Sequence, residues 1–298
     1  MPDQTQADKI AAGQGFIAAL DQSGGSTPKA LRLYGVAEDQ YDGEDEMFDR
    51  IHDMRARIVG SPAFTGDRVL GAILFEQTMD RDFHGRPAAE YLWDVKGVVP
   101  FLKIDHGLAA EDATGMQAMN DIAGLDATLG RAKAKGVFGT KERSVIGRAD
   151  RDGIARIAAQ QFDVGAKVLA HDMVPMLEPE VTISISDKAE AEAMLRDALL
   201  AGLNDVPEGQ RVMFKLTLPE QANLYADLVD HPKVLSVVAL SGGYDRAEAN
   251  RRLAQNRGMI ASFSRALAEG LSADQSNEQF DAQLDATVQS IRDASVAG

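Results

Sequence analysis

The sequence predicts an α/β protein whose 298 residues form one (β/α)8 TIM barrel, a single domain. Two observations predict this fold. Eight short apolar runs recur along the chain, and most are followed by a segment with helical periodicity. The runs are continuous, as expected of parallel strands buried on both faces. Eight such strands alternating with helices over roughly 250–300 residues are typical of this barrel, and a doubly wound sheet is the alternative.

The apolar runs give the expected strands, which are 15–20, 69–75, 97–103, 136–141, 173–178, 212–216, 234–240 and 259–263. Residues 1–298 therefore form one barrel with an extended first βα connection, expected to hold helices over 26–34 and 44–59. In the second of these, Phe48, Ile51 and Met54 recur at three-residue spacing and make one apolar stripe. A C-terminal helix is expected around residues 280–291, with a similar stripe.

Composition and charge exclude several classes of function. The chain has no cysteine, which excludes disulfides, thiolate catalysis and cysteine-ligated metals. Its net charge of -15 argues against a nucleic-acid or membrane partner, because a negative field repels both. An anionic small molecule is still allowed, since a few cations in a cleft can outweigh distant charges. The polar N-terminus and the lack of an apolar run of ~18 residues predict a cytoplasmic protein with no membrane segment.

Polar side chains close almost every apolar run. In a parallel barrel the carboxyl ends of all strands open on one face, so these side chains are expected to converge on one site. A single polar residue at a strand end commonly marks only the point where the chain reaches water, but eight in a row favour a site. The residues concerned are Asp21, Glu76, Lys103, Lys141 with Arg143, Glu178, Lys215 and Ser241, with Arg265 just after the last run.

Three lysines compete for the role of nucleophile. Same-face neighbours in a strand lie two residues apart, and on this spacing Lys103 has Asp105 beside it and Lys141 has Arg143. Lys215 has only Met213 and Thr217 at that spacing, so no carboxylate of its own strand holds its charge. A lysine in apolar surroundings loses its proton more easily, and the uncharged amine is the nucleophile. A lysine that merely extends from the strand end into solvent is the other interpretation.

The segment Glu178-Pro179-Glu180 places carboxylates at the end of another predicted strand. Imine formation needs a proton shuttle, and a carboxyl group near a cationic lysine can supply one. A pair of surface acids at a strand-to-loop transition is the alternative.

Two glycine-containing loops resemble anion-binding sites. Ser241-Gly242-Gly243 follows a strand and precedes a predicted helix over 246–255, where backbone N–H groups and the helix dipole would favour a phosphate. Ser264 and Arg265, just past the last strand, would add a hydroxyl and a cation. Ser23 to Lys29 form the second loop, which lacks the Gly-Lys-Ser/Thr ending of a Walker P-loop. Each glycine pair by itself is more often only a tight turn.

Metal and nicotinamide chemistry have little support. The five histidines are scattered, without a His-x-x-x-His spacing, and no G-x-G-x-x-G follows a strand. We therefore expect no metal and no cofactor.

Eight stretches together resemble one family, the class I (Schiff-base) fructose-1,6-bisphosphate aldolases, especially their short bacterial branch. They run through nearly the whole chain in order: FIAALDQSGGSTPKAL, GAILFEQTMD, GVVPFLKIDHGL, VFGTKERS, PMLEPEV, VMFKLTLP, ALSGGY and IASFSRAL. Each stretch is weak alone, but the ordered set is specific.

The resemblance implies catalytic roles for four residues. Lys215 is implied as the Schiff-base lysine and Glu178 as the acid and base of carbinolamine formation and dehydration. Lys141 is implied as an auxiliary lysine. Asp21 is implied as the carboxylate that takes the C4 hydroxyl proton during C3–C4 cleavage.

The resemblance also implies two phosphate sites. Ser241, Gly242 and Arg265 match the site for the dihydroxyacetone-phosphate half of the substrate. Lys103 matches a second auxiliary lysine. The residues implied near the other phosphate are Arg143, Ser26 and Lys29.

The chain departs from the animal members of that family at two places. Glu142 stands where they carry tryptophan, and the chain ends at Gly298 without their long tail and terminal tyrosine. Proton exchange at the enamine is therefore assigned to Glu178 or to a loop residue.

The sequence thus predicts a metal-independent lyase of glycolysis and gluconeogenesis that acts on sugar phosphates and works in the cytoplasm, with a homo-oligomer compatible with the sequence. Three alternatives stay open: another Schiff-base enzyme such as a transaldolase, a metal-dependent aldolase, and a non-catalytic phosphosugar-binding protein on the same barrel.

Overall fold

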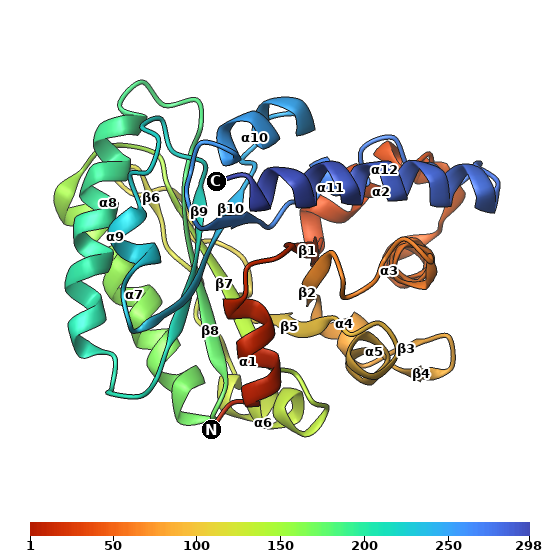
Figure 1. The fold of residues 1–298 in the computed structure, drawn as a ribbon, viewed down its shortest axis with the longest axis horizontal. Coiled ribbons are helices and arrows are strands. Elements are labelled where there is room, and N and C mark those ends of the chain that lie inside the picture. The colour runs from red at the N-terminus through yellow and green to blue at the C-terminus, as the bar shows by residue number, and fades with distance from the viewer.

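The computed structural model describes residues 1–298 and confirms the predicted barrel. Eight parallel strands follow one another around the barrel in chain order (Figure 1). They are β1 (Phe16–Leu20), β2 (Val69–Leu74), β5 (Val99–Lys103), β7 (Gly139–Ile146), β8 (Val174–Val181), β9 (Val212–Thr217), β10 (Val234–Leu240) and β11 (Met259–Ala261). A backbone hydrogen bond of 3.3 Å from Ala19 N–H to the Phe263 carbonyl joins the last strand segment to the first and nearly closes the ring.

Helices cover the outside of the barrel. Figure 1 shows α7 and α8 together on one side and α3 and α12 on the other. The longer helices are α1 (Gln4–Ala11), α2 (Thr27–Leu33), α3 (Gly43–Gly60), α6 (Leu125–Ala134), α7 (Arg151–Ala170), α8 (Lys188–Gly202), α10 (Arg246–Leu253) and α12 (Asn277–Val296). The shorter α-helical turns are α4 (Glu76–Met79), α5 (Ala88–Glu90), α9 (Ala226–Val229) and α11 (Arg265–Ala268). No helix combines the length and apolar composition that a membrane crossing needs.

Small elements occupy the connections between strands. They are the 3-10 turns η1 (Gly24–Ser26), η2 (Glu38–Gln40) and η4 (Leu203–Asp205), the π-helical turn η3 (Tyr91–Val95), the hairpin β3 (Asp82–Phe83) with β4 (Arg86–Pro87), and β6 (Met116–Gln117). The connection from β1 to β2 is the long one and contains both α2 and α3.

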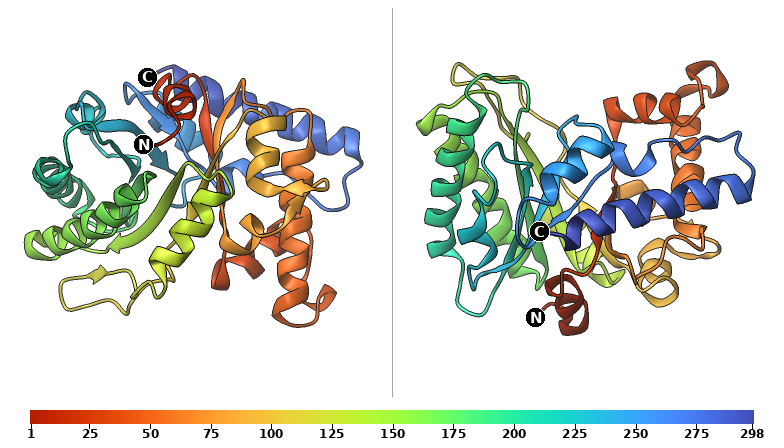
Figure 2. Two further views of the ribbon diagram at one scale, coloured as in Figure 1. Left: turned by 90° about the horizontal axis from the view of Figure 1, so that it is seen from below. Right: turned by 45° about the horizontal axis from the view of Figure 1, so that its top comes forward.

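The apolar stripes identified in the sequence explain where the outer helices pack. Phe48, Ile51 and Met54 of α3 are buried, as are Phe280 and Leu284 of α12. Helix α12 begins with a capping box at Ser276, where side chain and backbone satisfy each other's hydrogen bonds. Figure 2 shows α1 at one end of the molecule, and its Ile10 packs with the inward side chains of the strands.

The lower part of the barrel interior is filled by apolar side chains. Phe101 of β5 is fully buried, and two glycines make room for its ring. A Cβ atom at Gly71 or Gly139 would lie 2.9 or 3.0 Å from that ring, closer than carbon atoms can approach. The other inward residues at this level include Ile17, Val99, Met176 and Met213. The interior is therefore a packed floor beneath the strand ends.

Two predicted strand boundaries were wrong. Lys141 was placed at a strand end, but β7 starts three residues later than expected, at Gly139, and continues to Ile146. Strand β8 likewise continues past Glu178 to Val181. The two extensions pair with each other over their whole length, and β6 adds antiparallel pairing to the end of β7. Lys141, Arg143 and Glu178 thus lie within paired strands.

Glu142 faces away from the barrel interior and is completely buried. Its Oε2 accepts a hydrogen bond of 3.1 Å from the Thr140 hydroxyl, while its Oε1 has no partner. Burial raises the pKa of Glu142 well above its usual value. The folded chain therefore holds a proton that the unfolded chain releases above about pH 4.3. The free energy of unfolding therefore falls as the pH rises above that value, because only the unfolded chain can release this proton.

We expect Glu142→Gln, which cannot ionise, to be stabilised relative to wild type increasingly as the pH rises from 5 to 8. The gain is at most about 1.4 kcal/mol per pH unit. Denaturant unfolding across this range measures it. Glu208→Gln is the control, because that side chain is 93% exposed. A difference that stays constant with pH would mean that Glu142 is already ionised in the folded protein.

Candidate active site

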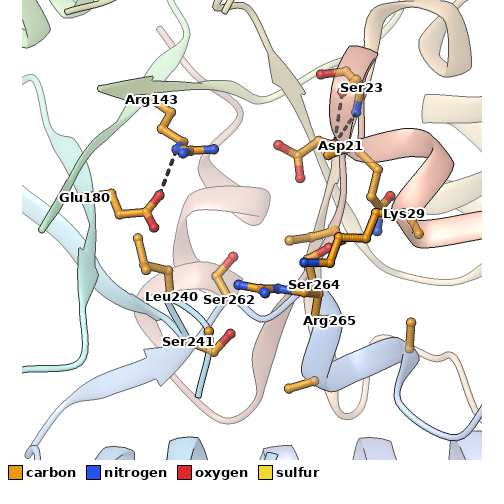
Figure 3. Close-up of a pocket in the computed structure, with 18 of the residues that line it drawn as sticks. Asp21, Ser23, Lys29, Arg143, Glu180, Leu240, Ser241, Ser262, Ser264 and Arg265 are labelled. Atoms are coloured by element: carbon orange, nitrogen blue, oxygen red, sulfur yellow. Dashed lines mark hydrogen bonds and ion pairs between the residues drawn. The ribbon is translucent and has the colours of Figure 1, made fainter. Parts of the chain in front are cut away.

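A cavity of about 820 Å³ opens at the carboxyl ends of the barrel strands (Figure 3). The site residues named from the sequence that line it are Asp21, Ser26, Lys29, Lys103, Lys141, Arg143, Glu178, Lys215, Ser241, Gly242, Gly243, Ser264 and Arg265. Glu76, which was expected to converge on the same site, does not line the cavity and instead pairs with Arg131. Many of the side chains that line the cavity lie on the same inward face of their strands as the apolar residues of the packed floor. On β9, for example, Lys215 follows Met213 by two residues, so both side chains point to the interior.

Lys141 lies at the centre of the charged groups. Its Nζ atom is 2.8 Å from Asp21 Oδ2 and 2.9 Å from Glu178 Oε2, and Asp105 Oδ2 lies 3.8 Å away. Burial opposes the charge on this amine, but the three carboxylates outweigh it and raise the pKa of Lys141 above its usual value. Lys141 is therefore a permanent cation that holds carboxylates in place.

Glu178 joins Lys141 to Lys215. Its Oε1 atom lies 3.0 Å from Lys215 Nζ, while Oε2 faces Lys141. Lys215 has no carboxylate beside it on its own strand, but the neighbouring strand supplies one, which the sequence spacing did not predict. The pairing of Met176 with Met213 brings Glu178, two residues further on, level with Lys215. A buried amine and a carboxyl group at this distance can exchange a proton directly.

Asp21 follows β1 and faces Lys141 from the opposite side to Glu178. Burial by itself would raise the pKa of Asp21, but Lys141, Lys215 and Lys103 together hold it below its usual value. Asp21 is thus an ionised carboxylate in a nearly dry site, where it can accept a proton from a hydroxyl group.

Four further carboxylates line the cavity, Asp105, Glu180, Asp245 and Glu269, and none of them was assigned as a site residue from the sequence. Asp105 Oδ1 lies 2.7 Å from Lys103 Nζ, and Asp105 Oδ2 accepts a hydrogen bond of 3.2 Å from Arg143 N–H. Glu180 Oε2 lies 2.7 Å from Arg143 Nε (Figure 3). Burial raises the pKa of Glu180. The cation of Arg143 partly opposes this rise, and the negative charge of the nearby Glu178 adds to it. The spacing in the sequence could have identified Asp105 and Glu180, because each lies two residues after a named site residue.

The loop after β10 has the properties of an anion site. Gly242 and Gly243 adopt φ angles of +60° and +126°, which other residues rarely adopt. A Cβ atom at Gly242 would also lie 2.6 Å from Ile183. The two glycine N–H groups donate to no protein acceptor. They are available to an anion, as expected from the sequence.

The prediction that the dipole of helix α10 favours an anion at this loop was wrong. The N-terminus of α10 is capped by Asp245, whose Oδ1 accepts a hydrogen bond of 2.8 Å from Glu248 N–H. A carboxylate thus already occupies the position that an anion would take.

Two cations at the cavity have no acidic partner. No carboxylate forms an ion pair with Lys29 or Arg265, although most other cations in the cavity have one. Figure 3 shows both side chains extending into the cavity. An Nη atom of Arg265 lies 3.5 Å from the position of a Cβ on Gly243, which places the guanidinium beside the glycine loop. Ser26 differs, because its hydroxyl donates to the Ser23 carbonyl at 2.9 Å within its own turn.

No three histidine, cysteine, aspartate or glutamate side chains lie in an arrangement that could hold a metal ion.

Solved structures resemble this chain in fold. The fructose-bisphosphate aldolase of Plasmodium falciparum, solved in complex with TRAP and a small-molecule inhibitor, superimposes with a TM-score of 0.78 at 19% identity, covering 99% of this chain and 96% of the other. A protein from Corynebacterium glutamicum superimposes with a TM-score of 0.58 at 14% identity, covering 98% of this chain and 92% of the other. At these identities the likeness supports the barrel fold alone.

Sequence similarity extends further. No protein-family model matches the chain. A protein of Synechocystis named fructose-bisphosphate aldolase class 1 is 55% identical over 295 residues, which cover 99% of this chain and 98% of the relative. At this identity over nearly the full length, the chain belongs to the class I fructose-bisphosphate aldolase family, whose members are metal-independent lyases.

Proposed function

We propose that this protein cleaves fructose 1,6-bisphosphate reversibly to dihydroxyacetone phosphate and glyceraldehyde 3-phosphate through an imine on Lys215. The observation that carries the assignment of residues is the Glu178 carboxylate, which lies between the amines of Lys215 and Lys141 in a buried site. Lys215 lines the open cavity, and unlike Lys141, which contacts three carboxylates, it has a single carboxylate partner to accept its proton.

The first stage forms the imine. Lys215 gives a proton to Glu178, and the free amine attacks C2 of the open-chain ketose. Glu178 returns that proton to the C2 oxygen and removes a second proton from the nitrogen, which leaves the neutral carbinolamine. It then gives the second proton to the C2 hydroxyl, which leaves as water while the nitrogen lone pair completes the protonated imine. The 3.0 Å distance from Lys215 Nζ to Glu178 Oε1 supports this exchange, because proton transfer needs hydrogen-bond contact. The fixed charge of Lys141 keeps Glu178 in position.

The second stage breaks the C3–C4 bond. Asp21 takes the proton of the C4 hydroxyl, a C4–O double bond forms, and the C3–C4 electron pair moves into the imine to give an enamine. Glyceraldehyde 3-phosphate leaves, and the proton held by Asp21 returns by way of water to Glu178, which protonates C3. Hydrolysis of the imine then releases dihydroxyacetone phosphate. The neutral enamine replaces an unstable carbanion, which is the catalytic gain.

The phosphate groups give the substrate its orientation. We assign the phosphate on C1 to the N–H groups of Gly242 and Gly243, with Ser241, Ser264 and Arg265. The phosphate on C6 is assigned to Arg143 and Lys103, with Ser26 and Lys29 at the edge of the cavity. Holding both ends fixes the reacting carbons against Lys215 and Asp21.

Two broader assignments accompany the reaction. We propose that the protein works in the cytoplasm, where its sugar-phosphate substrates occur, and that it has no nucleic-acid partner. The net charge of -15 supports the second point, because phosphate backbones repel such a surface. A homo-oligomer is compatible with the fold.

Borohydride reduction in the presence of dihydroxyacetone phosphate is expected to attach one triose phosphate to Lys215. Peptide mapping by mass spectrometry identifies the labelled lysine. Lys215→Met should give neither adduct nor turnover, because no amine remains to form the imine. An adduct on Lys141 or Lys103 in the wild type would overturn the assignment.

Arg265→Ala is expected to raise the Michaelis constant for fructose 1,6-bisphosphate by about 10- to 100-fold, the usual effect of losing a charge-assisted hydrogen bond. Steady-state kinetics and thermal unfolding are measured together. Arg257→Ala is the control, since that half-exposed arginine pairs with Asp230 away from the cavity. An unchanged Michaelis constant for Arg265→Ala would exclude Arg265 from phosphate binding.

Exhaustive treatment with EDTA is expected to leave turnover unchanged, because the imine supplies the electron sink that a metal ion would otherwise provide. Activity is compared before dialysis, after it, and after addition of zinc. Loss of activity that zinc restores would assign the protein to metal-dependent chemistry.

A further inference from the structure

A fully buried arginine lies behind the cavity and takes no part in the mechanism above. Arg55, on α3, is 1% exposed, although an arginine is rarely buried without a carboxylate partner. No acidic side chain forms an ion pair with it. Burial lowers the pKa of Arg55 to about 10, opposed chiefly by the charge of Asp21, so the guanidinium stays protonated at neutral pH. A charged side chain on this apolar helix face is costly to bury, which indicates a functional role for it.

The contacts of Arg55 lead to the catalytic end of β1. One Nη atom donates to the Thr78 hydroxyl at 2.7 Å, and the other donates to the main-chain carbonyl of Gln22. Gln22 is the residue directly after Asp21. The arginine therefore fixes the backbone that carries the proposed base of the cleavage step. Its positive charge also interacts favourably with the Asp21 carboxylate.

The side chain of Gln22 continues the connection. Its Nε2 donates to the Ser264 hydroxyl at 2.8 Å, and its Oε1 lies 3.4 Å from an Nη atom of Arg55. Ser264 directly precedes Arg265, the first residue of α11. Arg55 and Gln22 thus link the base on one strand end to the phosphate loop at another.

We propose that Arg55 is a positioning residue for the carbon–carbon cleavage step, because it holds the Asp21 segment in register, and that the Gln22 side chain positions the Ser264–Arg265 turn for phosphate. The inference rests on the function proposed above. It adds a division of labour: Arg55 affects cleavage and Gln22 affects substrate binding. Neither residue touches the reacting carbons, and imine formation at Lys215 is independent of both.

The division predicts separate kinetic effects. Arg55→Met is expected to lower kcat for cleavage by about 10- to 100-fold, the cost of a misplaced catalytic group. Borohydride trapping of dihydroxyacetone phosphate on Lys215 should stay within about twofold of wild type, because that step does not use Asp21. When fructose 1,6-bisphosphate is the trapped substrate, mass spectrometry should find the uncleaved hexose bisphosphate on Lys215 of the variant in place of the triose.

Two further variants test the connection. Arg55→Lys keeps the charge and should recover part of the lost kcat. Gln22→Met should raise the Michaelis constant by about 5- to 20-fold with kcat nearly unchanged, since it removes the side-chain bonds to Ser264 and Arg55 but keeps the bond from Arg55 to the Gln22 main chain. The two variants also keep the test informative if Arg55→Met does not fold.

Arg57→Met is the matched control on the same helix. Arg57 makes several hydrogen bonds to the main chain of residues 272–275 and none to the strand ends, so its loss should lower the melting temperature but leave kcat within about twofold. Equal loss of trapping and cleavage in Arg55→Met, or undiminished cleavage, would overturn the inference. Failure of the wild type to be trapped at all would instead overturn the proposed function.

Discussion

The shared carboxylate of Glu178 is the interaction on which the rest of the site depends. Buried charges are costly unless each is paired, because desolvation costs several kcal/mol per ion. In this barrel Asp21, Asp105, Glu178 and Glu180 face Lys103, Lys141, Arg143 and Lys215, so acids and bases are equal in number. Glu178 contacts Lys141 and Lys215 at once, as Asp105 contacts Lys103 and Lys141. The charges of this network balance without substrate, and Lys29 and Arg265 stay outside it without an ion-pair partner, available to phosphate.

The barrel places this network by strand alternation alone. Every second residue of a strand points inward, so the apolar floor and the charged layer above it are successive members of one series. Met176 leads to Glu178 and then Glu180, and Phe101 leads to Lys103. The rigid floor gives the charged layer its precision, because side chains rooted in a packed core have little freedom to reorient.

Much of the fold was predictable because each strand has a local signal, a short continuous apolar run. The position of most named residues at the cavity was predictable for a related reason, since they stand next to such a run and parallel strands end on one face, whereas Ser26 and Lys29 were named from the loop after the first run. The predictions that failed or were missing depend on contacts between residues that are far apart in the sequence. The pairing of Glu178 with Lys215 follows from the register of β8 with β9, and the length of β7 follows from its pairing with β6 and β8. Arg55 gives no signal in the sequence, since a lone arginine on a helix is ordinarily exposed.

The aromatic packing around Phe101 determines how material reaches the reacting amine. The residues beneath Lys215 are fully buried and leave no passage to the far end of the barrel. Ketose, water and both three-carbon products must therefore share a single entrance. One triose stays bonded to Lys215 until hydrolysis, so the aldehyde has to depart first, and the water that frees the second triose arrives through the space the aldehyde has vacated. The closed base of the barrel thereby imposes an order on product departure.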